Sequence, residues 1–311
     1  MRLHDFPRAA LGHFPTPICR LEAISSLINT QVYIKRDDLS GLGLGGNKTR
    51  ALEFLLGDAQ AKGAQLVFTT GTPQSNHAML TAAAAGKCGM QTVLLLKKRG
   101  STDCVGNQVL NRMMNTEIRW IDTDDYEEIY AQMDRLGEAL GKPYYKIPCG
   151  GSNALGTLGY VDCAREISQQ GFRPSHIICA EGSGGTAAGL TLGAQMFLPG
   201  AQVHAMSICS EPFAQIVPAL MRGAAALLGE DGPENPKPPS QRQMQGEGFG
   251  VLSPEGRAAA EQMARLEGLF LDPCFTAKAF AGLLQMAEEG AFTPDDRVLF
   301  YHSGGAGGIF A

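Results

Sequence analysis

A lysine follows two glycines and an asparagine at the predicted start of a helix. Residues 45–50 read Gly-Gly-Asn-Lys-Thr-Arg, and the glycines let the backbone come close to a ligand. A helix N-terminus favours anions and lowers the pKa of a nearby amine. Because a lysine of lowered pKa can form a Schiff base and carry protons, Lys48 is a candidate catalytic residue. An ordinary surface lysine after a loop is the alternative.

A glycine-rich loop with two hydroxyl residues joins a predicted strand, residues 176–180, to a predicted helix, residues 187–196. In such a loop, backbone N–H groups and hydroxyls converge where the helix dipole adds positive potential. The loop matches neither GxGxxG with a trailing acid nor GxxxxGK[ST], so the dinucleotide and ATP motifs are absent. A tight turn is the alternative to a phosphate site. The loop residues are Gly182, Ser183, Gly184, Gly185 and Thr186.

A third polar segment lies between the predicted strand 66–70 and a helix over residues 78–87. The N–H groups of a helix start, with the side chains of Ser75 and Asn76, could hold a carboxylate, and His77 could carry a proton. The alternatives are a simple N-cap and a structural histidine.

A hydroxyl residue, Ser303, follows the last predicted strand, residues 298–301. Parallel sheets bind ligands beyond the carboxyl ends of their strands, so this hydroxyl would face such a site. A glycine-rich turn near the C-terminus is the alternative.

Short apolar strands alternate with helices along the chain, which predicts an α/β fold with open, mostly parallel sheets covered on both faces. Residues 92–96 and 203–208 complete the set of predicted strands, and residues 49–62 and 255–267 have the apolar spacing of helices. The stretch 223–246, rich in Pro, Gly and Gln, is predicted to be a surface excursion.

Composition excludes several classes of protein. The 311 residues are 44% hydrophobic and 18% charged with a net charge of −5, which is typical of a globular protein and not of a nucleic-acid surface. No apolar stretch is long enough to span a membrane, and the N-terminus lacks the apolar core of a signal peptide. The 8 cysteines have no metal-ligand spacing, so we expect small buried side chains in a reducing, cytoplasmic compartment and no metal.

Taken in order, these segments resemble the pyridoxal 5′-phosphate (PLP) enzymes of the D-cysteine desulfhydrase and 1-aminocyclopropane-1-carboxylate (ACC) deaminase family. That family belongs to the tryptophan-synthase-β-like group, fold type II. The resemblance covers nearly the whole chain, and although each motif alone is weak, their order is specific. It also includes Phe-Pro-Thr-Pro at 14–17, Tyr-Ile-Lys-Arg-Asp-Asp at 33–38, Gly-Asn at 106–107, Gly-Gly-Ser-Asn-Ala-Leu-Gly at 150–156 and Leu-Asp-Pro at 271–273.

The resemblance implies a two-domain homodimer. Residues 1–49 and 156–311 would form the large cofactor-binding domain, and residues 50–155 the small substrate-side domain. It further implies that Lys48 is the Schiff-base lysine and the base for the α-proton, and that residues 182–186 hold the cofactor phosphate.

Further roles follow from the same resemblance. Asn76 would contact the phenolic oxygen of the cofactor, while Ser75 and the backbone of residues 76 and 77 would clamp the substrate carboxylate. Ser303 would lie near the pyridine nitrogen, with Thr276 as a competing candidate. A hydroxyl partner leaves that nitrogen mostly unprotonated, which suits fast loss of a β-leaving group.

Two residues depart from the family pattern. Phe249 and Phe275 stand where the family usually has tyrosines that handle the leaving group or attack the cyclopropane ring. Phenylalanine has no donor or acceptor, so ACC deamination is disfavoured, D-cysteine desulfhydration stays open, and the pocket becomes more apolar.

The function indicated is a lyase that acts on a small amino acid by β-elimination, giving pyruvate and ammonia. Two alternatives stay open. One is β-replacement, deamination or racemisation of another small amino acid, and the other is a PLP-binding protein that has lost catalysis.

Overall fold

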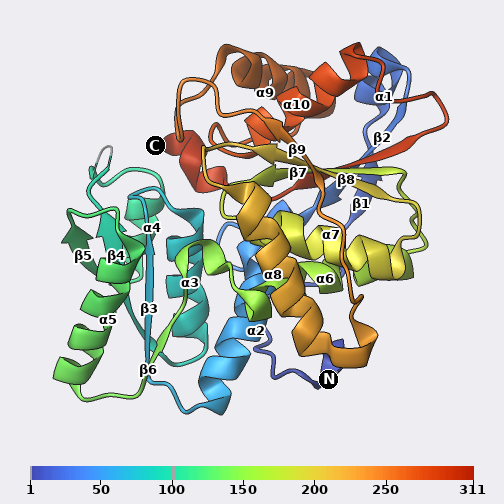
Figure 1. Ribbon diagram of the computed structural model, residues 1–311. Helices are drawn as coiled ribbons and strands as arrows, with labels where there is room; N and C mark the ends of the chain where they lie inside the picture. Colours follow the sequence, from blue (N-terminus) through green and yellow to red (C-terminus); the bar gives the residue numbers. More distant parts are fainter. Residues whose placement is uncertain (1, 100–101) are drawn as a thin grey trace.

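A computed structural model of the chain describes residues 2–99 and 102–311 and contains two separate sheets (Figure 1). The larger has six strands in the order β1-β2-β10-β7-β8-β9. Every neighbouring pair is parallel except β1 with β2. The strands are β1 (Ile18–Arg20), β2 (Gln31–Arg36), β7 (His176–Glu181), β8 (Gln202–Ser207), β9 (Ser240–Gln243) and β10 (Arg297–His302).

Helices cover both faces of the large sheet, as its strands require. All six residues of β7 are buried, so neither face of this strand meets solvent. Figure 1 shows α9 and α10 on one face and α6, α7 and α8 towards the other. The helices are α1 (Glu22–Ile28), α6 (Ala154–Gln169), α7 (Gly185–Phe197), α8 (Phe213–Leu228), α9 (Pro254–Glu267) and α10 (Thr276–Glu288).

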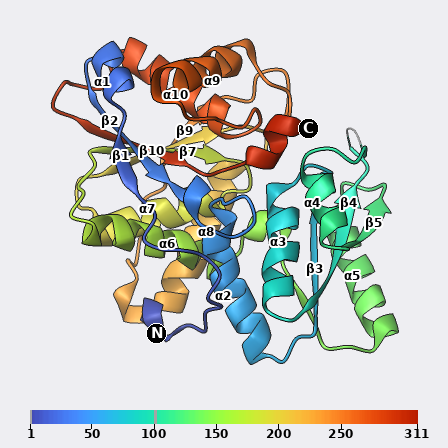
Figure 2. The ribbon, with the colours of Figure 1, turned by 180° about the vertical axis from the view of Figure 1, so that it is seen from behind.

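The smaller sheet is entirely parallel, in the order β5-β4-β3-β6. Helix α2 (Lys48–Ala61) lies between this unit and the large sheet in both views (Figures 1 and 2). The small unit consists of β3 (Leu66–Gly71), β4 (Gln91–Lys97), β5 (Glu117–Ile121), β6 (Tyr144–Lys146), α3 (Asn76–Lys87), α4 (Asn107–Met113) and α5 (Tyr126–Leu140). The predicted α/β fold with two mostly parallel sheets is confirmed.

The prediction for residues 223–246 is wrong at both ends. Helix α8 continues to Leu228, because Val217, Met221 and Leu228 bury one apolar stripe of it. Gly223 lies inside this helix where an added Cβ would be 3.0 Å from Ala154 Cβ, so the glycine allows close packing and does not end the helix. Residues 240–243 form the edge strand β9.

The expectation of buried cysteines is also wrong for most of them. None of the 8 cysteines, all within the described ranges, forms a disulfide, and only Cys163 and Cys179 are buried. Cys19 is exposed because it lies on the three-residue edge strand β1.

Within residues 2–99 and 102–311, no helix combines the length and the apolar character needed to cross a bilayer.

Candidate active site

The loop that carries Lys48 is attached to the end of β10. The Asn47 N–H donates to the Ser303 carbonyl at 3.0 Å, and Gly46 bridges Gly304. A Cβ added at Gly304 would lie 2.6 Å from Gly46 Cα, so only glycine permits this backbone contact. The fold thereby brings together two segments that lie more than 250 residues apart in the sequence.

Lys48 is the first residue of helix α2, and its side chain is partly buried. Among the described residues its one hydrogen bond goes from Nζ to the Gly150 carbonyl, at 2.9 Å. Burial lowers the pKa of this amine to about 8, although the nearby Cys149 opposes the shift. The neutral amine, which is the nucleophilic form, is therefore far more populated near neutral pH than in an exposed lysine.

The loop between β7 and α7 has the features of an anion site. Ser183 Oγ lies 2.8 Å from Ser152 Oγ. The first helical bond of α7 runs from the Ala188 N–H to the Gly184 carbonyl, so the N–H groups of residues 185–187 have no acceptor inside the helix. Thr186 Oγ1 accepts a hydrogen bond from Asn47 Nδ2 at 2.9 Å. The candidate phosphate loop and the lysine loop are therefore in direct contact.

The third predicted segment starts helix α3. Ser75 is the N-cap, and its Oγ accepts from the Ala78 N–H at 3.1 Å, so the capping role that the sequence left open is observed. His77 is 3% exposed, and its Nε2 lies 2.9 Å from Thr69 Oγ1. Burial, together with the charge of Lys48, lowers the pKa of His77 to about 3. His77 is therefore neutral near Lys48 at physiological pH.

The two candidates for the pyridine nitrogen differ in how their hydroxyls are used. Thr276 is fully buried, and its Oγ1 donates to Asp272 Oδ1 at 2.7 Å and accepts from the Asp272 N–H at 2.8 Å. The Ser303 hydroxyl has no partner among the described residues and is partly exposed. Of these two hydroxyls, that of Ser303 is the one that the described residues leave free to meet a ligand.

Phe249 and Phe275 lie together beside the candidate phosphate loop. Their rings form an edge contact with centroids 5.9 Å apart. A Cβ added at Gly182 would be 2.8 Å from Phe275 Cε1, which places this ring against the start of the loop. Phe249 is 44% exposed, so the pair forms an apolar wall that reaches the surface.

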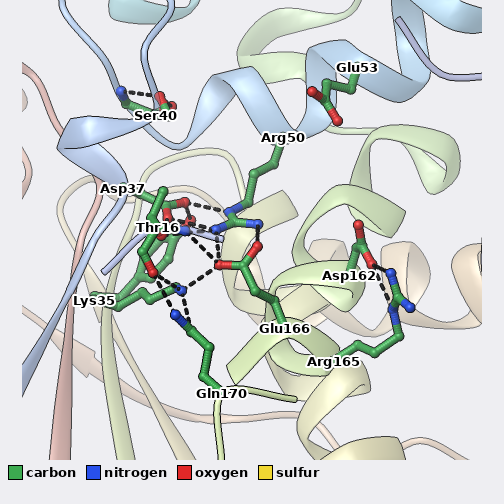
Figure 3. Close-up of polar contacts among 12 residues, drawn as sticks. Thr16, Lys35, Asp37, Ser40, Arg50, Glu53, Asp162, Arg165, Glu166 and Gln170 are labelled. Atoms are coloured by element: carbon green, nitrogen blue, oxygen red, sulfur yellow. Dashed lines mark hydrogen bonds and ion pairs between the residues drawn. The ribbon is translucent and has the colours of Figure 1, made fainter. Parts of the chain in front are cut away.

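A buried ionic network lies behind the lysine loop and was not foreseen from the sequence (Figure 3). Arg50 donates to Asp37 through Nε at 2.6 Å and Nη2 at 2.8 Å, and to Glu166 through two bonds of 3.0 Å. Lys35 also pairs with Glu166, and Tyr301 donates to Asp37. Burial alone would raise the pKa of Asp37, but Arg50, Tyr301 and Thr16 hold it below its ordinary value. The sequence signal that could have indicated this network is the presence of charged residues in β2, the strand before the lysine loop.

These residues fit PLP. The start of α7 offers N–H groups and the Ser183 hydroxyl to a phosphate, and among the residues that the structure describes the Lys48 amine is bound only to a carbonyl. A Cβ at Gly185 would lie 2.7 Å from Ser152 Oγ, and one at Gly150 would overlap Ser183 Oγ, so side chains are excluded from this cradle. Lysine and phosphate loop thus meet beside the carboxyl ends of β7 and β10.

Two mostly parallel sheets with a lysine and a candidate anion loop at their junction are typical of a PLP-dependent enzyme, and the comparisons with known proteins agree. The family model for pyridoxal-phosphate dependent enzymes matches residues 9–304. The D-cysteine desulfhydrase of Yersinia enterocolitica is 38% identical over 331 residues, covering 100% of this chain and 97% of that protein. The chain therefore belongs to the D-cysteine desulfhydrase and ACC deaminase family of PLP-dependent enzymes.

Solved structures extend the comparison. The crystal structure of an ACC deaminase homologue has a TM-score of 0.92 and 38% identity, and the match covers 99% of this chain and 94% of that one. O-ureido-L-serine synthase has a TM-score of 0.69 at 19% identity over 98% of this chain and 92% of its own, which is a likeness of fold alone.

Proposed function

We propose that this enzyme is a lyase that acts on a small amino acid by β-elimination and releases pyruvate and ammonia. The observation that carries the proposal is the contact between the lysine loop and the phosphate loop, through Asn47 and Thr186. This contact, together with a pKa of about 8 for the Lys48 amine, supports a role for Lys48 beside the candidate phosphate loop. The bound cofactor would supply a conjugated ring that takes up the negative charge formed at the α-carbon.

Each loop contributes one task in this proposal. Residues 182–186 would hold the phosphate, Asn76 would donate to the phenolic oxygen, and the Ser303 hydroxyl would meet the ring nitrogen. Lys48 would hold the cofactor, and its amine would be the base for the α-proton of the substrate. Ser75 and the N–H groups at the start of α3 bind the substrate carboxylate.

The phenylalanine pair sets the range of leaving groups. Neither Phe249 nor Phe275 can donate a proton, so a leaving group that departs as a stable anion is favoured over one that needs protonation. We therefore expect β-chloroalanine to be a better substrate than cysteine or serine. Since the family includes proteins named D-cysteine desulfhydrase, both stereoisomers of each substrate belong in the test.

The test measures pyruvate and ammonia from D- and L-cysteine, serine, β-chloroalanine and cysteate with the reconstituted enzyme. Lys48→Ala is expected to lose both turnover and the visible absorption band of the bound cofactor. Lys62→Ala is the matched control, because Lys62 follows the end of the same helix and its side chain is 64% exposed. Equimolar pyruvate and ammonia support elimination, and a new amino acid formed with an added nucleophile would indicate β-replacement instead. The proposal would be refuted if none of these substrates gave pyruvate and ammonia, or if Lys48→Ala kept full turnover.

The assembly and domain division are further parts of the proposal. A homodimer follows from the family resemblance and is tested by light scattering of the purified enzyme. A cytoplasmic location agrees with 8 unpaired cysteines. Residues 50–155 as the smaller domain agree with a four-stranded sheet that runs from residue 66 to residue 146.

A further inference from the structure

Hydrogen bonds link three amide residues, Gln74, Asn76 and Asn107, at the start of helix α3. Asn107 begins helix α4, and its backbone N–H donates to Gln74 Oε1 at 2.9 Å. The Asn107 side chain donates through Nδ2 to the Gln74 carbonyl at 2.9 Å and to Asn76 Oδ1 at 2.7 Å. Asn107 is fully buried, whereas Asn76 is partly exposed.

Backbone groups fix the orientation of these linked amides. The backbone carbonyl of Gln74 can only accept, so the Asn107 atom that meets it must be the NH₂ group. That NH₂ group can only donate, so the Asn76 atom facing it must be the oxygen. The Asn76 NH₂ group is therefore the end that points away from Asn107, and it has no partner among the described residues.

The buried Asn107 side chain has one polar atom left unsatisfied by the described residues. Its two amide hydrogens are both used, while its buried Oδ1 has no hydrogen bond from the described residues. Gly307 packs against this oxygen so closely that a Cβ there would overlap it. An unsatisfied buried acceptor is unfavourable, so the value of Asn107 lies in its donors, one of which sets Asn76.

We propose that Asn107 is a positioning residue that makes Asn76 a hydrogen-bond donor toward the phenolic oxygen of the cofactor. This rests on the proposed function, in which Asn76 meets that oxygen. A donor stabilises the anionic oxygen and makes it less basic. Without Asn107 the Asn76 amide can turn and present its own oxygen, which repels the anion.

The test is the pH midpoint of the visible absorption band of the bound cofactor. Asn107→Leu removes the donors with little change in size. Asn111→Leu is the matched control, since Asn111 lies on the same helix, is 1% exposed, and neither of its amide atoms has a partner among the described residues. Asn76→Ala gives the reference for complete loss of the donor. Gly307→Ala is a second way to displace Asn107 if Asn107→Leu folds poorly.

We expect Asn107→Leu and Asn76→Ala to raise the midpoint by a similar amount, roughly one pH unit, and Asn111→Leu to leave it unchanged. In the Asn76→Ala background, Asn107→Leu should add nothing, because it acts only through Asn76. The inference is overturned if Asn76→Ala shifts the pH midpoint and Asn107→Leu does not. It is also overturned if Asn107→Leu shifts the midpoint equally in the wild-type and the Asn76→Ala backgrounds. A wild-type enzyme with neither band nor pyruvate would instead refute the proposed function.

Discussion

Replacing Arg50 with methionine should strongly destabilise the fold, because it leaves a buried carboxylate without its cation. Asp37 is 0% exposed and Arg50 is 2% exposed, and two hydrogen bonds of 2.6 and 2.8 Å join them. Breaking a buried pair by removing one partner costs about 3–5 kcal/mol. Methionine keeps part of the packing against the Phe14 ring, over which the guanidinium carbon lies at 4.2 Å, so the loss is mainly electrostatic.

Arg165→Met is the matched control for Arg50→Met. Arg165 also pairs with a carboxylate, Asp162, but its side chain is 38% exposed, and Arg8 already pairs with the same carboxylate. Exposed pairs contribute about 0–1 kcal/mol. Figure 3 shows Arg165 beside Asp162, apart from the hydrogen bonds that join Arg50 to Asp37 and Glu166. Urea unfolding followed by circular dichroism at neutral pH should separate the two variants clearly.

The effect of Arg50→Met should also depend on pH. In the wild type the pKa of Asp37 lies below its ordinary value, so its stabilisation is present above the unfolded pKa of about 4 and is lost as pH falls. Without Arg50, burial raises the pKa of Asp37, and the ionised carboxylate opposes folding at neutral pH. The difference between wild type and variant should therefore shrink on acidification. A loss no larger than that of Arg165→Met, or one that persists unchanged at acid pH, would refute this reasoning.

Two other predictions concern the reacting groups. Because the pKa of Lys48 is about 8, the rate of PLP incorporation into the apoenzyme should rise between about pH 7 and about pH 9 and then level off; a rise that continues to the range of an exposed lysine would contradict it. Phe275→Tyr should raise turnover of D-cysteine relative to β-chloro-D-alanine by about tenfold or more, because a positioned phenol can protonate the thiolate. Phe270→Tyr, at a site that is 69% exposed, should leave that ratio unchanged.

Local patterns were enough to predict about half of the strands and fewer than half of the α-helices that the described residues form. The strand predicted over residues 66–70 runs from Leu66 to Gly71, and the helix predicted over 255–267 runs from Pro254 to Glu267. Both have their signal within a few neighbouring residues. The failure at 223–246 has the opposite cause. Gly223 is a helix residue because it packs against α6, and this contact between distant segments is not visible in the local sequence.

The supporting contacts of the site could not be predicted, because they join distant segments. Arg50 and Glu166 are 116 residues apart, and the acceptor for Lys48, Gly150, is 102 residues away. No periodicity links such positions. The orientation of Asn76 likewise depends on Asn107, 31 residues further along the chain. The motif residues were visible in the sequence, but their hydrogen-bond directions were not.

The lowered pKa of Lys48 has a different physical origin from the one that its sequence position indicated. A helix start was expected to lower it, but burial is the main cause in the folded chain. The contrast with Lys35 explains why only one of these two amines is suited to chemistry. Lys35 Nζ contacts the Glu166 carboxylate and two further oxygen acceptors, so its charge is compensated and its donors are occupied. Within the described part of the chain, Lys48 meets a single neutral carbonyl, so its charge is not compensated and burial favours the neutral amine.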